Sequence, residues 1–183
     1  MQRKAVLQNV CLIIDFEGYF INKKFYTREL GWTNWQGNFG CKHYQQPFRW
    51  KTLNQIDRQT ARYVYHCIHG LPFEDDPQEN ARHLENLKGD VLEIYQQSHS
   101  PERFLVGYKG GHMEKNLLKE LDLPAINLEH CGCPKFEKLD FFTIQDCGQH
   151  KKQALGHCAM VETQSFWQWM VMGDEDWETN SCL

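Results

Sequence analysis

The sequence predicts an α/β fold built on one mixed β-sheet, in which three antiparallel strands are joined by parallel strands and flanked by helices. Two observations predict it. An apolar run at residues 10–14, rich in β-branched side chains, is typical of a buried central strand, and strand-like segments at 23–32 and 41–48 follow it across short turns. Helical and strand patterns then alternate from residue 52 to residue 128, which requires parallel strands joined by crossovers.

The other elements follow from the spacing of apolar residues. Recurrence at about 3.6 residues predicts helices over 52–69, 80–97, 112–121 and 153–172. Short apolar segments predict strands over 103–108 and 124–128. We expect the first strand to end at Asp15 to Glu17, one domain to cover residues 8–172, and residues 173–183 to form a flexible acidic tail.

The composition is that of a globular domain. With 183 residues, 41% hydrophobic and 24% charged, the chain can bury a core and is unlike disordered or fibrous proteins. No apolar run approaches the ~20 residues that span a bilayer, and the start lacks the pattern of a signal peptide. We therefore expect no membrane partner and an intracellular location, cytoplasmic or nuclear. A net charge of −4 argues against binding nucleic acid through a basic surface alone, but allows contact with its backbone through metal ions.

Asp15 and Glu17 are the first chemical signal. Residues two apart on a strand share a face, so both carboxylates point the same way from a buried strand. Two such acids repel each other unless a cation lies between them, and a hard divalent ion with oxygen ligands fits that position. The alternative is a solvated strand end with no ligand.

A second signal lies near the C-terminus, where Glu162 follows His157 by five residues with a small residue between them. This spacing resembles the H-x-A-x-x-D motif of the DEDDh 3′–5′ exonucleases, which have a ribonuclease-H-like fold, and Glu114 stands where that family has an acid after the fourth strand. The resemblance implies that Asp15, Glu17, Glu114 and Glu162 hold two Mg²⁺ or Mn²⁺ ions and that His157 deprotonates the attacking water. Glu114 and Glu162 depart from the family, which has Asp at both positions.

Cysteine and histidine form a second set of candidate ligands. The chain has eight cysteines and nine histidines, and Cys147, His150 and Cys158 occur within one short stretch. Thiolates and imidazoles are the ligands that Zn²⁺ prefers, and Cys133 lies close enough in the chain to supply a fourth. The alternative is that these cysteines are small core residues.

The C-x-x-H spacing followed by a later cysteine is similar to the Maelstrom domain, which resembles a DEDDh exonuclease that has lost its acids and gained a zinc site of Glu, Cys, His and Cys. Its Glu ligand has two candidate replacements here, Glu17 or Cys133. Neighbouring His157 and Cys158 would point roughly 100° apart on a helix, so the zinc and carboxylate sites can coexist. Two functions remain open: a metal-dependent nuclease acting on RNA or single-stranded DNA, and a catalytically inactive, zinc-stabilised module that binds nucleic acid or protein.

Overall fold

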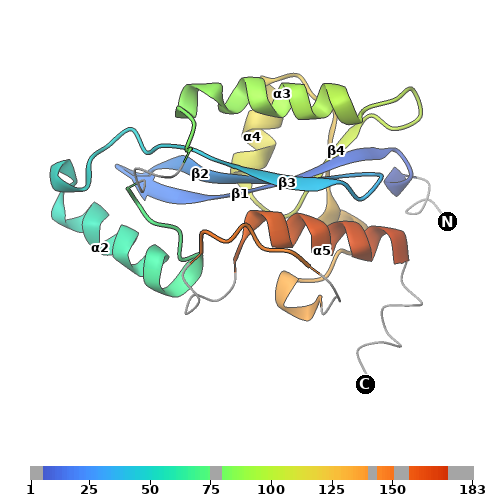
Figure 1. Cartoon of the computed structure of the whole chain (residues 1–183). Coiled ribbons are helices and arrows are strands. Elements are labelled where there is room, and N and C mark those ends of the chain that lie inside the picture. Colours follow the sequence, from blue (N-terminus) through green and yellow to red (C-terminus); the bar gives the residue numbers. More distant parts are fainter. Residues whose placement is uncertain (1–5, 75–79, 140–143, 151–156, 173–183) are drawn as a thin grey trace.

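A computed structural model of the chain describes residues 6–74, 80–139, 144–150 and 157–172. These residues form an α/β fold around one five-stranded sheet in the order β3-β2-β1-β4-β5 (Figure 1). The pairs β1–β2 and β2–β3 are antiparallel, whereas β1–β4 and β4–β5 are parallel. The expected mixed sheet with flanking helices is confirmed.

The antiparallel half consists of β1 (Val10–Ile21), β2 (Lys24–Asn34) and β3 (Phe39–His43). Asn22 and Lys23 join β1 to β2 with positive φ angles of 50° and 62°, as tight hairpin turns require. The expected end of the first strand was wrong. β1 continues to Ile21, so its two acids lie inside the strand rather than at its end.

The parallel half consists of β4 (Leu105–Tyr108) and β5 (Ala125–Asn127). The crossover helices are α3 (Leu87–Ser98), which follows a short 3₁₀ turn, and α4 (His112–Glu120). The helix expected over 80–97 therefore begins later than its apolar spacing indicated.

Two pairs of helices cover opposite faces of the sheet (Figure 1). The helices α3 and α4 lie on one face, and α2 (Gln55–Tyr63) and α5 (Ala159–Met172) lie on the other. The helix expected over 153–172 begins at Ala159; its first residues and the expected tail at 173–183 lie outside the described residues. Of the helices within the described ranges, none combines the length and apolar character that crossing a bilayer requires.

Strand β1 carries apolar side chains to both faces. Leu12, Ile14 and Phe16 pack with residues of α3 and α4, while Val10 and Ile13 pack with residues of α5. Because the side chains of a strand alternate, the two acids of β1 share the face of Ile13 and point toward α5.

The first turn of α5 lies directly on β2. A Cβ added to Gly31 would lie 2.1 Å from the carbonyl carbon of Ala159, so only glycine permits this approach. Beyond it, the Thr33 hydroxyl donates a 3.0 Å hydrogen bond to the hydroxyl of Thr163. The beginning of α5 is thereby held at a fixed position above β1 and β2.

Substitution of Gly31 tests this contact. Gly31→Ala should lower the free energy of unfolding by about 1–3 kcal/mol, because the methyl group overlaps backbone atoms that cannot rotate away. Gly89→Ala is the matched control: Gly89 lies within α3 with nothing near its added Cβ, and alanine there should stabilise by roughly 0.5–1 kcal/mol. Chemical denaturation measures both. Equal stability of the Gly31→Ala and wild-type proteins would contradict the close contact.

Candidate functional site

Four acids and one histidine converge between β1 and the start of α5. Asp15 and Glu17 come from β1, and both carboxylates experience the negative charge of Glu162 on α5. Asp15 is only 8% exposed, so it faces the protein interior rather than solvent.

Glu114 enters the same group from the first turn of α4. Strand β4 ends at Tyr108 and does not extend along β1 to Phe16, whose backbone N–H instead donates a 3.1 Å hydrogen bond to Oε1 of Glu114. The other carboxylate oxygen, Oε2, is buried and has no hydrogen-bond partner among the described residues. A buried oxygen without a partner is costly unless a proton or a cation satisfies it.

His157 and Glu162 complete the group. Nδ1 of His157 lies 2.6 Å from Oε1 of Glu162, and this hydrogen bond fixes the orientation of the imidazole. One ligand atom each from Glu17, His157 and Glu162 lies within 4.8 Å of the others, which is a separation that a single metal ion can bridge. Of the five residues that the sequence predicted for the carboxylate site, Glu17, His157 and Glu162 form this close set. Asp15 and Glu114 are near enough to feel the charge of Glu162 but do not belong to the set.

Burial and mutual repulsion disfavour ionisation of these acids. Burial, followed by the charges of Glu162 and Glu114, raises the pKa of Asp15 well above its usual value. Burial and then Glu162 do the same for the pKa of Glu17, and burial raises the pKa of Glu114 to about 7. A cation among the carboxylates would reverse each shift, because its positive charge favours the ionised forms.

The metal-free protein should therefore lose stability as pH rises. The pKa of Glu114 rises from 4.5 to about 7 on folding, so its contribution is fully present below pH 4.5 and is lost as pH increases through 7. In chelator, Glu114→Gln should reduce the fall in unfolding free energy between about pH 5 and 8 by on the order of 3 kcal/mol. Denaturant titrations at several pH values measure it. An unchanged fall in the variant would show that Glu114 does not ionise in this range.

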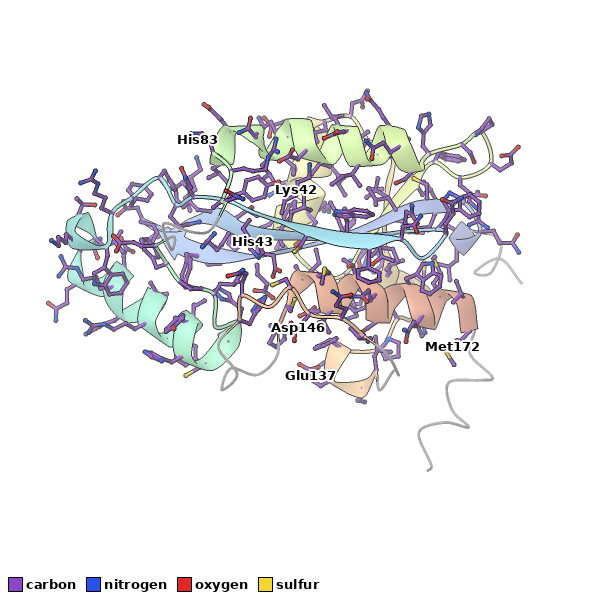
Figure 2. All side chains as sticks on the ribbon, viewed as in Figure 1. Lys42, His43, His83, Glu137, Asp146 and Met172 are labelled. Atoms are coloured by element: carbon purple, nitrogen blue, oxygen red, sulfur yellow. The ribbon has the colours of Figure 1, made fainter. Side chains whose placement is uncertain are left out.

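A second group of ligands lies beside the first. The carboxylate of Glu29, the sulfurs of Cys147 and Cys158 and an imidazole nitrogen of His150 all lie within 4.8 Å of one another. Nε2 of His150 is 3.0 Å from Oε2 of Glu29, and Sγ of Cys158 is 3.6 Å from Oε1. In Figure 2 the label of Asp146 marks the segment before α5 that carries Cys147 and His150.

Glu29 is fully buried and is held in its ionised form. Its Oε2 accepts a 3.1 Å hydrogen bond from the backbone N–H of Ala159 at the start of α5. Burial alone would raise its pKa, but its contacts with His150 and His43 outweigh burial and lower the pKa well below the usual value. The other ring nitrogen of His150, Nδ1, contacts the carbonyl oxygen of His69, so Nε2 is the nitrogen directed at the group.

Glu29 is the candidate ligand that the sequence did not identify. Cys133, the expected fourth ligand, lies instead in the core between the sheet and α5 with Val10 and Phe166. Glu17, the other candidate, is paired with Glu29 across the β1–β2 ladder, but its carboxylate belongs to the group with His157. The sequence signal that could have identified Glu29 is an acidic residue inside a segment predicted to be a strand.

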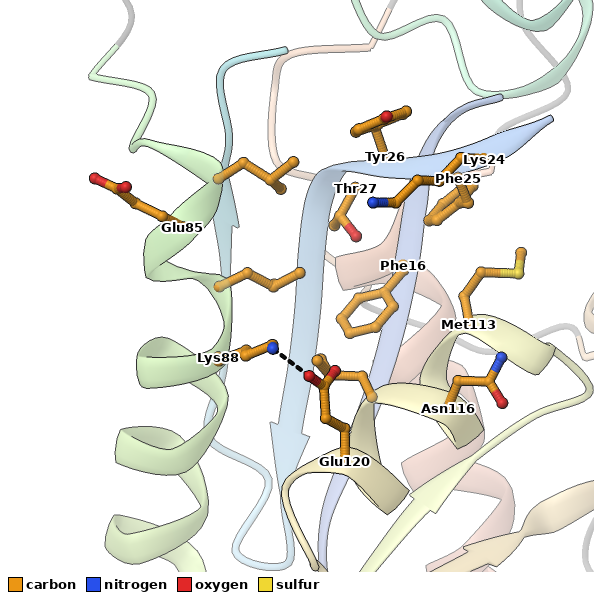
Figure 3. A pocket seen from close by; sticks show the side chains of 13 residues that line it. Phe16, Lys24, Phe25, Tyr26, Thr27, Glu85, Lys88, Met113, Asn116 and Glu120 are labelled. Carbon is orange, nitrogen blue, oxygen red and sulfur yellow. Dashed lines mark hydrogen bonds and ion pairs between the residues drawn. The ribbon is translucent and has the colours of Figure 1, made fainter. Parts of the chain in front are cut away.

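The opposite face of the sheet carries a pocket of different character (Figure 3). It measures about 700 Å³ and lies between β1, β2, α3 and α4. Phe16, Phe25 and Met113 supply apolar lining, and an ion pair joins Lys88 to Glu120 at its side. Because Phe16 points away from the acids on either side of it, this pocket is separate from both ligand groups.

Comparisons with protein-family models, with curated proteins and with solved structures found no match for this chain. Two groups of side chains could hold metal ions. An oxygen-rich group lies on β1 and around the start of α5, and a sulfur- and nitrogen-containing group lies on β2 and the segment before α5. They are neighbours because Glu17 and Glu29 are directly opposite each other in the sheet.

Proposed function

We propose that this chain is a metal-dependent nuclease of the DEDDh type, with a ribonuclease-H-like fold, acting as a 3′–5′ exonuclease on RNA or single-stranded DNA. The observation that carries the proposal is that the ligand atoms of Glu17, Glu162 and His157 lie within 4.8 Å of one another, with buried Asp15 and Glu114 close enough to feel the charge of Glu162. The strand order, with three antiparallel strands beside two parallel ones, supports the same fold.

The four carboxylates would hold Mg²⁺ or Mn²⁺. Hard divalent cations prefer carboxylate oxygens, and the buried Oε2 of Glu114 lacks any other partner within the described chain. When bound, such ions stabilise the negative charge that develops on a phosphodiester during hydrolysis. The protein contributes a rigid arrangement, since Asp15 and Glu17 lie on the central strand and Glu114 is fixed by the backbone of Phe16.

His157 is the general base in this proposal. Its Nδ1 is engaged by Glu162, which leaves Nε2 to accept a proton from water. Its ring also lies against Phe136, with centroids 5.8 Å apart, so it is held from two sides. The hydrogen bond that His157 donates to Glu162 raises the pKa of His157, so activity should rise at a higher pH than it would with an unperturbed histidine.

Nuclease activity can be tested with a labelled single-stranded oligonucleotide and Mg²⁺ or Mn²⁺. Wild-type protein should release nucleotides from the 3′ end, Asp15→Asn should abolish release, and His157→Ala should slow it about 10²–10⁴-fold, the usual worth of a general base. Glu85→Gln, which removes an exposed acid, is the matched control and should keep full activity. No release by wild type from RNA or DNA with either ion would refute the nuclease.

The second candidate function is a catalytically inactive, zinc-stabilised module of the Maelstrom type that binds nucleic acid or protein. One observation favours it: the two acids that depart from the nuclease pattern are both already engaged, Glu114 with the N–H of Phe16 and Glu162 with His157. Inactive protein that still retains zinc would support this function.

We also infer that the second group binds Zn²⁺ as a structural ion. Glu29, Cys147, His150 and Cys158 supply one oxygen, two sulfurs and one nitrogen, which suits the four-coordinate geometry of zinc. Such an ion would tie β2 to the segment at 144–150 and to the residue before α5. It would thereby hold the start of α5, which carries Glu162, and His157 just before it.

Zinc content and thermal stability test this site. Purified protein should contain one zinc ion or more. Chelation should remove about 4 kcal/mol of stabilisation that comes from linked binding. At roughly 2–4 °C per kcal/mol, this loss should lower Tm by roughly 10 °C. Cys158→Ala should reproduce the loss, whereas Cys67→Ala, at an exposed cysteine, should not. Protein prepared with excess zinc that retains none would rule out the site.

A further inference from the structure

We propose that two zinc ions bind around Glu29 and Cys147 and share these two residues as ligands. The first ion is the structural ion proposed above, on which this inference rests. The second would be held by Cys41 and His43 of the edge strand β3, together with the two shared residues. These four residues form a second set, which overlaps the first at Glu29 and Cys147, and their ligand atoms also lie within 4.8 Å of one another.

The sheet register places Cys41 and His43 at this position. On β3, His43 is directly opposite Glu29 and Cys41 is directly opposite Gly31 of β2. Residues opposite each other in an antiparallel pair project to the same face, and Cys41 and His43, two apart, share that face. Since α5 begins above Gly31, both side chains point into the space where Cys147 and Cys158 lie.

His43 is directed at the group, but its contact with Glu29 is too long for a well-formed hydrogen bond. Its Nε2 is buried and has no hydrogen-bond partner within the described residues, although it lies 3.5 Å from Oε1 of Glu29. Figure 2 shows His43 on β3, on the side of the sheet that α5 covers. A buried ring nitrogen left unsatisfied costs free energy, and coordination of a metal would satisfy it.

Glu29 is arranged to serve both ions. Its Oε2 is 3.0 Å from Nε2 of His150 in the first set, and its Oε1 faces Nε2 of His43 in the second. Oε1 also lies 3.6 Å from Sγ of Cys158 in the first set, so both carboxylate oxygens face candidate ligand atoms. Cys147 belongs to both sets, so its thiolate would be the second bridge, and each ion would have four protein ligands.

Charge balance also favours two ions. A single Zn²⁺ held by the ionised forms of Glu29, Cys147 and Cys158 leaves one negative charge uncompensated in a largely buried position. A second Zn²⁺ together with ionised Cys41 leaves the whole group neutral. Because burying net charge is unfavourable, the neutral arrangement is the more stable one.

Metal stoichiometry decides between one ion and two. The full chain, kept reduced and equilibrated with Zn²⁺, should carry about two zinc ions by native mass spectrometry and by elemental analysis. One ion per chain would overturn the shared site while leaving the structural zinc site in place. No bound ion would overturn both.

Variants and a cadmium probe locate the second ion. Cys41→Ala and His43→Ala should each reduce the stoichiometry to about one, and Cys67→Ala should leave it at two. The wild-type protein loaded with ¹¹³Cd²⁺ should give two cadmium resonances that are coupled through the shared thiolate. Two ions retained in Cys41→Ala, or two uncoupled resonances in wild type, would contradict the bridged arrangement; the wild-type measurements decide the question even where a variant fails to fold.

Discussion

The contact between the first turn of α5 and β2 at Gly31 is the constraint on which both ligand groups depend. Without a side chain at Gly31, the backbone of Ala159 reaches the sheet itself. Cys158 is then placed over Glu29, and His157 with Glu162 is placed over the acids of β1. The start of one helix therefore contributes to both candidate groups, which differ in chemistry. The backbone N–H of Ala159 holds the buried Glu29 between them.

The polar groups collected here would destabilise an ordinary core. Burial is normally favourable for apolar side chains and costly for unpaired carboxylates, yet Asp15, Glu29 and Glu114 are nearly or fully buried. The rest of the fold compensates with apolar packing on both faces of β1. Unfavourable groups that accumulate at one place, while the surroundings obey the usual rules, are a physical sign of a binding site.

Much of the architecture was predictable because it depends on local patterns. Alternation in β1 correctly indicated that Asp15 and Glu17 share a face, and helical spacing indicated the crossovers. Glu29 could not be recognised, because a β-bulge shifts the β1–β2 register between Glu17 and Gly18 and so breaks the simple alternation along β2. Cys133 was misplaced for a different reason: nearness in the chain does not determine which side of a helix a residue packs against.

The direct pairing of Glu17 with Glu29 would couple the two groups thermodynamically. Besides burial and Glu162, the charge of Glu29 is among the causes that raise the pKa of Glu17. A cation that neutralised Glu29 would remove this repulsion and so make it easier for Glu17 to lose its proton. Linkage is reciprocal, so loss of the Glu17 proton would in turn strengthen ion binding at Glu29. The central hairpin would thus make ion binding at one group sensitive to the protonation state of the other.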